Sequence, residues 1–231
     1  MNNLSEQSAA LVTCSYGPDL NRCARLCRSI ERWVSPTIPH VIIVPARDLP
    51  DFRQLQGQRR TVVAVEDVVP GRFRQLPFTR RWWLASGGWP VRGWIMQQVT
   101  KLSANFATDA ELIVFADSDL QFVRPLEPHQ LLRNGALRLH RIPGAKDEGR
   151  HRLWHHRAAA LLGEQPRYFG ADYVGQLISW RRSNLGLLQE HLEAVGGRPW
   201  YQSVARSLHF SEYVLYGAYV DGVLGLDSSG H

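Results

Sequence analysis

Two carboxylates separated by one serine follow the strongest apolar stretch of the chain. The run Glu111–Ala116 (ELIVFA) leads directly into Asp117-Ser118-Asp119. Ligands of α/β proteins bind beyond the carboxyl ends of the strands, and paired carboxylates can hold a hard cation that keeps positions open for phosphate oxygens. The motif therefore favours a Mn²⁺ or Mg²⁺ site at Asp117 and Asp119, where the cation would neutralise a departing diphosphate. A plain polar turn after a strand is the alternative interpretation.

Three further segments carry polar groups that could serve chemistry. Thr13–Asp19 combines a strand end with a helix start, which suits a nucleotide or a diphosphate. Lys101 lies off the apolar stripe of its expected helix, and either faces a phosphate site or is an ordinary solvated lysine. Glu212 lies among aromatic residues, where burial raises a carboxyl pKa toward the range of a general base. The alternative for Glu212 is a bond to neighbouring backbone or to an arginine.

Apolar runs and helical spacing predict the elements that position these residues. Strands and helices alternate in the first half, and the strands are continuous apolar runs, as in parallel sheets covered on both faces. We therefore expect an α/β fold with a mostly parallel sheet. The expected strands are Ala9–Tyr16, His40–Pro45, Thr61–Val65 and Glu111–Ala116, and the expected helices are 20–34 and Arg92–Phe106, the latter with the stripe Ile95, Val99, Leu102 and Phe106.

The second half is less regular. Residues 133–157 are rich in Arg and His and predict a long, basic, partly mobile connection. A further strand is expected within Tyr173–Trp180, a helix over Leu185–Val195, and partial helix over Ser203–Tyr219. No boundary is sharp, so 1–231 is expected to form a single domain, with a nucleotide-binding half to about residue 125 and an acceptor half after it.

Composition and charge narrow the class of protein. The 231 residues are 44% hydrophobic, which is typical of a globular protein, and no apolar run approaches the ~18 residues of a membrane span. Met1–Ala10 has no signal-peptide pattern, and the three cysteines favour a reduced, cytoplasmic protein. The net charge is +6, almost all from arginine, which suits phosphates and carboxylates. Base composition of the genome could also produce this bias.

Charge alone does not choose the partner. The segment Arg133–Arg157 could dock on the inner face of an anionic membrane. Trp82-Trp83, Trp89 and Trp94 cluster around glycines, which favours a packed loop or a sugar platform over a stacking stripe for nucleic acid. No nucleic-acid partner is therefore expected. The sequence contains neither a dinucleotide-binding glycine motif nor a P-loop, which disfavours a dehydrogenase and a P-loop NTPase.

Four ordered segments resemble GT-A type glycosyltransferases of the nucleotide-diphospho-sugar transferase superfamily. They are LVTCSYGPDLNRCARLC, GWIMQQVTKL, LIVFADSDLQFVRPL and FSEYVLYGAYV, and the resemblance spans residues 9–222. The group most similar to this chain is bacterial, little characterised and of unassigned substrate. The resemblance implies a Rossmann-like GT-A fold that binds a nucleotide-sugar donor beyond its first strands.

The resemblance also implies roles for individual residues. Asp117 and Asp119 match the acidic motif that binds Mn²⁺ or Mg²⁺, and Glu212 matches an acid that activates or orients the acceptor hydroxyl. The loop Gly170–Gly175 would lie against donor and acceptor, with Gly170, Asp172 and Gly175 on the acceptor side. The residues expected at the donor are Thr13, Ser15, Tyr16, Gln98, Lys101, Asp117 and Ser118.

One departure from the GT-A pattern concerns a histidine. These enzymes commonly have a further metal-binding histidine near the C-terminus, and this chain ends at Asp227-Ser228-Ser229-Gly230-His231. Either His231 supplies the ligand or the ligand is missing, and in the second case the chain is a truncated or incomplete copy.

The leading hypothesis is a metal-dependent glycosyltransferase that moves a sugar from a nucleotide sugar to an acceptor hydroxyl, in bacterial glycan or polysaccharide synthesis. Inverting and retaining stereochemistry both stay open. A sugar nucleotidyltransferase is less favoured, because the turn Gly17-Pro18-Asp19 is short and lacks a basic glycine-rich loop. A glycoside hydrolase with an Asp and Glu pair is a further alternative. An inactive scaffold of the same fold, or a basic binding protein, is the alternative outside catalysis.

Overall fold

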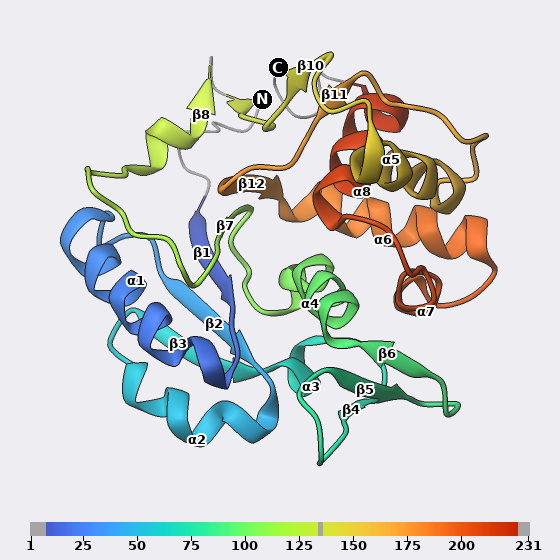
Figure 1. Ribbon diagram of the computed structural model, residues 1–231. Helices are drawn as coiled ribbons and strands as arrows, with labels where there is room; N and C mark the ends of the chain where they lie inside the picture. The colour runs from blue at the N-terminus through green and yellow to red at the C-terminus, as the bar shows by residue number, and fades with distance from the viewer. Residues whose placement is uncertain (1–7, 134–135, 226–231) are drawn as a thin grey trace.

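The central feature is a five-stranded sheet in the order β12-β7-β1-β2-β3 (Figure 1). The computed structural model describes residues 8–133 and 136–225. Four strands are parallel, and the edge strand β12 pairs with β7 in the antiparallel direction. The predicted α/β class with a mostly parallel sheet is confirmed. The strands are β1 (Ala9–Cys14), β2 (His40–Val44), β3 (Arg60–Ala64), β7 (Leu112–Ala116) and β12 (Leu177–Arg181).

Helices cover both faces of this sheet, which explains its continuous apolar strands. On one face Leu26 and Ile30 of α1 (Leu20–Trp33) pack in one cluster with Val114 of β7. On the other face Phe115 packs edge-on against Trp180, with the two ring centroids 4.6 Å apart. Successive residues of β7 therefore enter different cores, which explains why this strand is apolar at every position. The helices on the second face are α4 (Gly93–Leu102), α6 (Arg182–Gly196), α7 (Trp200–Ala205) and α8 (Glu212–Tyr219).

The basic segment 133–157 differs from its prediction. Helix α5 (Gly149–Leu161) occupies its second part, and Ala158 and Ala159 are fully buried. The prediction of a long connection is wrong for residues 149–157, because the arginines there mark only the exposed positions of a helix whose buried positions are mostly alanine. Four short strands form two further pairs in this region: β8 (Leu132–Arg133) with β9 (Ala136–Leu137), and β10 (Ile142–Pro143) with β11 (Ala171–Asp172).

A small antiparallel sheet stands where the sequence indicated only a loop. It consists of β4 (Phe73–Gln75), β5 (Trp82–Ala85) and β6 (Pro90–Arg92), and β6 runs directly into α4. Trp83 and Ala85 are buried while their neighbours are exposed, which is the alternation of a half-buried strand. Gly87 and Gly88 both have positive φ and form the turn between β5 and β6. The alternation of buried and exposed residues covers only four positions, so the sequence pattern alone does not distinguish this strand from a packed loop.

Other predicted boundaries shift by a few residues. The helix expected over Arg92–Phe106 ends at Leu102, and a 3₁₀ turn over Ala104–Phe106 leaves Phe106 exposed. The strand expected within Tyr173–Trp180 begins only at Leu177. Two further short helices are α2 (Leu49–Phe52) and α3 (Val65–Val68), and a π-helical turn over Val220–Leu224 follows α8. Among the described residues, no helix combines the length and the hydropathy that a membrane crossing requires.

A buried histidine in α5 makes the fold sensitive to acid. His155 is fully buried, and its Nδ1 accepts a hydrogen bond from the backbone N–H of Phe169 at 3.3 Å. Burial lowers the pKa of His155 from 6.5 to about 4, although the nearby carboxylates Asp172 and Asp147 oppose the shift. Protonation would place a hydrogen on Nδ1 where it now accepts one. The folded state therefore favours the neutral ring.

The free energy of unfolding is expected to fall as the pH falls from 6.5 toward 4. Above this window His155 causes no loss, and below it the loss is complete and no longer changes with pH. The loss at about pH 5, relative to about pH 7.5, is expected to be about 2 kcal/mol. Urea denaturation of the wild type and of His155→Gln at both pH values measures it. Glutamine keeps an acceptor for the Phe169 N–H, so the variant should lose clearly less stability with pH. An equal loss in both proteins would show that His155 is not the titrating group.

Candidate functional site

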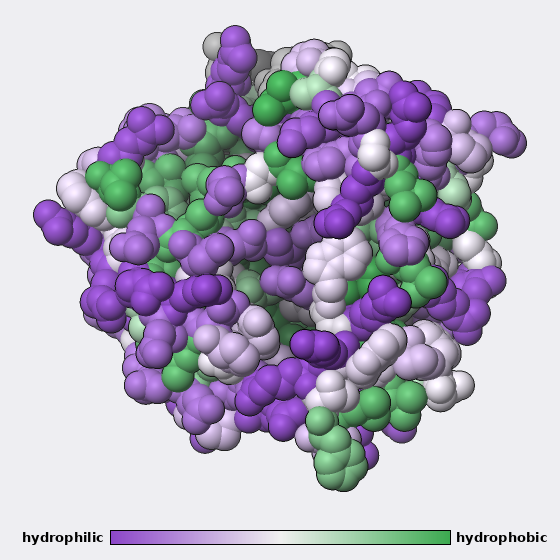
Figure 2. Space-filling model, viewed as in Figure 1, coloured by the Kyte–Doolittle hydropathy of each residue, from purple (hydrophilic) through white to green (hydrophobic). Residues whose placement is uncertain are grey.

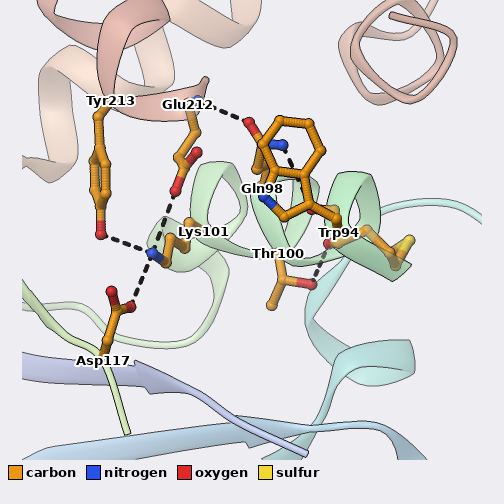
Figure 3. Close-up of polar contacts among 8 residues, drawn as sticks. Trp94, Gln98, Thr100, Lys101, Asp117, Glu212 and Tyr213 are labelled. Atoms are coloured by element: carbon orange, nitrogen blue, oxygen red, sulfur yellow. Dashed lines mark hydrogen bonds and ion pairs between the residues drawn. The ribbon is translucent and has the colours of Figure 1, made fainter. Parts of the chain in front are cut away.

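A buried lysine contacts side chains beside Asp117-Ser118-Asp119, which we call the acidic turn (Figure 3). Lys101 Nζ donates to Asp117 Oδ1 at 3.0 Å and to the Tyr213 hydroxyl at 2.7 Å. It also forms an ion pair with Glu212 Oε1 at 3.2 Å. We call Lys101, Asp117, Glu212 and Tyr213 the lysine cluster. The lysine interpreted in the sequence as either solvated or phosphate-facing thus lies at the centre of the predicted site.

The sheet and two helices bring the lysine cluster together. Asp117 is the first residue after β7, Lys101 lies in the last turn of α4, and Glu212 begins α8. Gln98, one turn before Lys101, accepts a hydrogen bond from the backbone N–H of Glu212 at 3.0 Å through its Oε1. The side chain of Gln98, which was predicted to bind the nucleotide-sugar donor, is therefore buried and bonded within the protein. It fixes the start of α8 against α4, which holds Glu212 and Tyr213 over Lys101.

The charges of the cluster are unequal in their contact with water. The side chains of Lys101 and Glu212 are 6% and 8% exposed, whereas that of Asp117 is 41% exposed. Burial disfavours the ammonium, but the negative charges of Glu212 and Asp117, with the hydroxyl of Tyr213, outweigh it and hold the pKa of Lys101 well above its usual value. The cluster thus contains one permanent cation, one enclosed carboxylate, and one carboxylate that is accessible to a ligand.

A cavity of about 570 Å³ opens beyond the carboxyl ends of β1 and β2. Its walls come from those strand ends, from the small sheet β4–β6 and from α4. Figure 2 shows a hollow in this part of the molecule, surrounded mainly by hydrophilic side chains. The lining contains three arginines and three tryptophans and, within the described residues, no carboxylate. These residues are Arg80, Arg81, Arg92, Trp82, Trp83 and Trp94.

The lining chemistry suits a ligand with both charge and a flat or apolar part. Guanidinium groups match phosphate oxygens with paired donors, and tryptophan faces accept bases or sugar rings. The guanidinium of Arg92 already lies over the ring of Trp82, 5.8 Å from its centroid. The tryptophans were predicted from the sequence as a sugar platform, whereas the arginines beside them were not predicted as ligands. The signal was the run Arg80-Arg81-Trp82-Trp83, which interleaves the two residue types.

The first turn after β1 is fixed by a buried aspartate. Asp48 Oδ2 accepts a hydrogen bond from the backbone N–H of Gly17 at 2.8 Å, and its Oδ1 is paired with Arg80. Asp48 is fully buried, so this contact ties the turn at Gly17 to the connection between β4 and β5. The two sides of the cavity are thereby linked. Arg81 and Arg92 have no ion pair among the described residues.

The residues predicted at the first strand end separate into two groups. Ser15 and Tyr16 line the cavity. Thr13 does not line it, because its hydroxyl is buried, donates to the Ala116 carbonyl at 2.9 Å and lies 2.9 Å from His40 Nε2. Thr13 joins β1 to its two neighbours in the sheet. Cys14 connects the cavity to the cluster: burial raises the pKa of its thiol to about 12, with smaller effects from Lys101, Asp117 and Glu212.

The acidic turn offers two carboxylates of different accessibility. Asp119 is exposed, while Ser118 between them is buried. Across the described residues, no three His, Cys, Asp or Glu side chains are arranged to hold a metal ion. The donor set therefore does not fit a cation enclosed by protein ligands alone. It does fit Mg²⁺ or Mn²⁺ that brings phosphate oxygens and waters of its own, because such ions need only one or two carboxylates.

The predicted acceptor-side residues lie away from this cavity. Gly170 has positive φ, and its carbonyl accepts a hydrogen bond from Gly144 N–H at 2.8 Å. Asp172 is buried, with its Oδ1 3.6 Å from His151 Nδ1. Gly175 lies against His140, because a Cβ built on it would stand 3.0 Å from His140 Nε2. Residues 170–175 therefore do not line the cavity at the ends of β1 and β2. His231 lies outside the described residues.

The fold and site define an α/β protein with a mostly parallel sheet, compatible with a Rossmann-like fold, that carries a cavity beyond the carboxyl ends of its strands. The chain belongs to the family of unknown function DUF6492, whose model matches residues 8–228. No curated protein matches the sequence.

Proposed function

We propose that this protein is a metal-dependent glycosyltransferase with a GT-A fold. The observation that carries the proposal is the position of the arginine and tryptophan cavity, at the carboxyl ends of β1 and β2 and next to the lysine cluster. A nucleotide sugar has the flat base, the diphosphate and the sugar that these residue types recognise. The partners are then a nucleotide-sugar donor and a hydroxyl acceptor in bacterial glycan synthesis, and the location is the cytoplasm.

In this proposal the cavity orients the donor. Arg81 and Arg92 would bind diphosphate oxygens, and Trp82 and Trp94 would pack against the base or the sugar. Asp117 and Asp119 would hold Mg²⁺ or Mn²⁺, which supplies charge neutralisation to the leaving diphosphate when it is bound. Lys101 aligns Asp117 through the 3.0 Å hydrogen bond and adds a fixed positive charge beside it.

The transfer forms a bond from the acceptor oxygen to the anomeric carbon and breaks the bond from that carbon to the phosphate oxygen. The bonding electrons leave with the diphosphate, and the acceptor hydroxyl loses its proton. Glu212 is the proposed proton acceptor, because Lys101 Nζ joins its carboxylate, at 3.2 Å, to Asp117 of the metal-binding turn, at 3.0 Å. Its pairing with Lys101 also gives it a positioning role, since it holds the ammonium toward Asp117.

The test is release of nucleoside diphosphate from nucleotide sugars. Each common nucleotide sugar is incubated with the protein and Mn²⁺ without an acceptor, and slow hydrolysis is followed by chromatography. We expect release from one nucleotide class, and none after addition of a chelator. Lack of release from every donor, in the presence of simple sugar acceptors as well, would favour an inactive scaffold.

A further inference from the structure

A second cavity, of about 750 Å³, has more basic residues in its lining than the first. It lies against β12 on the α1 face of the sheet, since Leu177 and Ser179 line it and Ser179 is paired with Val114 of that face. Its lining includes four arginines and one histidine and, within the described residues, no aspartate or glutamate. These basic residues are Arg124, Arg133, Arg138, Arg141 and His140.

Most of this positive charge is not neutralised by the protein. Arg141 is paired with Asp221, with Nε and Oδ2 2.7 Å apart. The guanidinium groups of Arg124, Arg133 and Arg138 form no ion pair in the described part of the chain. Like charges collected around a cavity repel one another, and a bound anion relieves this repulsion. Guanidinium groups prefer phosphate and carboxylate, and several of them together favour the higher charge of phosphate groups.

The cavity also lies at the edge of the sheet that carries the acidic turn. Leu177 is paired with Ala116, the residue before Asp117. The connection that begins with the acidic turn continues to Arg124, so one loop joins the two sites. Because successive residues of β7 face opposite sides, Asp117 turns toward α4 while Ala116 faces the side of the cavity. The acidic turn and the second cavity therefore lie on the two sides of the end of β7.

The segment that sequence analysis assigned to the acceptor borders the same cavity. Pro143 lines it and is paired with Ala171, next to Asp172. His140 also lines it and is in contact with Gly175. The acceptor-side loop therefore does not line the first cavity but borders the second.

We propose that the second cavity binds the phosphate groups of a phosphate-bearing acceptor. The assignment to the acceptor rests on the proposed glycosyltransferase function, whereas the phosphate site itself rests only on the cavity and its charge. The phosphate could belong to a lipid headgroup or to a soluble phosphorylated compound. Both sources present the same chemistry to the arginines, and the experiment separates them.

The first arm measures binding of inorganic pyrophosphate by calorimetry, with a chelator present to remove metal-dependent binding. The variant Arg124→Gln/Arg133→Gln/Arg138→Gln is expected to bind at least about tenfold more weakly than the wild type, because it loses several charge-assisted hydrogen bonds. All three side chains are exposed, so the fold should persist, which circular dichroism verifies.

The control variant is Arg25→Gln/Arg53→Gln/Arg157→Gln, which removes the same charge from exposed positions outside the cavity. Its pyrophosphate affinity should change by less than about twofold. An equal loss in both variants, or unchanged binding in the cavity variant, would overturn the proposal. The single variant Arg138→Glu gives the same decision if the triple variant does not fold.

The second arm is sedimentation with vesicles of phosphatidylglycerol and phosphatidylcholine, compared with phosphatidylcholine alone. Binding to the anionic vesicles that needs the three cavity arginines would assign a lipid-borne phosphate. Pyrophosphate binding without vesicle binding would assign a soluble ligand.

Binding of nucleoside diphosphate with Mn²⁺ is measured in the same variants and should not change. If the wild type does not bind nucleoside diphosphate with Mn²⁺ but still binds pyrophosphate through the three arginines, the donor site is refuted and the phosphate site is supported.

Discussion

Replacement of Lys101 by methionine is expected to lower the free energy of unfolding by about 3–5 kcal/mol, the usual cost of removing one partner from a buried ion pair. Glu212 is the reason, since its side chain is 8% exposed and the lysine is its only ion-pair partner among the described residues. Methionine has a similar length and no charge, so the carboxylate would remain enclosed without a counter-ion. Asp117 suffers less because water reaches it. Urea denaturation measures the difference.

The chain supplies its own control for this variant. Lys146 is the other of its two lysines and is exposed, so Lys146→Met should change stability by less than about 0.5 kcal/mol. The double variant Lys101→Met/Glu212→Gln removes both charges and should recover part of the loss. Equal stability of Lys101→Met and the wild type would mean that the lysine cluster does not hold α8 against α4.

Replacement of Asp119 by alanine is expected to weaken Mn²⁺-dependent binding of nucleoside diphosphate by at least about a hundredfold, because even loss of an outer-shell partner costs a metal site about 10–100-fold. Asp119 is exposed, so stability should change by less than about 0.5 kcal/mol. Calorimetry with and without Mn²⁺ measures the effect.

Asp109→Ala is the matched control, because Asp109 is a fully exposed carboxylate at the other end of β7. Its variant should bind nucleoside diphosphate like the wild type. Equal affinity of Asp119→Ala and the wild type in Mn²⁺ would remove Asp119 from the metal site and leave Asp117 as its remaining carboxylate.

The parallel sheet could be predicted because its signal is local. Each buried strand is a continuous apolar run such as Leu112–Ala116, and the polar residue that ends it marks the carboxyl edge. Asp117 and the strand end at Ser15 were therefore found from the sequence alone. The two carboxylates and the cavity lie at that edge because parallel strands share one direction.

The contacts that assemble the site are not local and left no periodic signal. Lys101 and Tyr213 are 112 positions apart, and nothing in the spacing of either helix indicates that they meet. Thr13 was predicted to bind the donor because it lies near the end of β1, but its hydroxyl donates to the Ala116 carbonyl of the neighbouring strand β7. The arginines of the small sheet were missed because a four-residue strand gives too short an alternation. The role of Glu212 as a base stays a prediction.

Thermal unfolding of the wild-type protein with a panel of nucleoside diphosphates and nucleotide sugars, each with and without Mn²⁺, tests whether the cavity is a metal-dependent donor site. A ligand that binds only the folded state raises the melting temperature by mass action. We expect one nucleotide class to raise it in the presence of Mn²⁺, and little or no shift with the chelator. The same melting temperature with every nucleotide, with and without metal, would contradict the glycosyltransferase proposal.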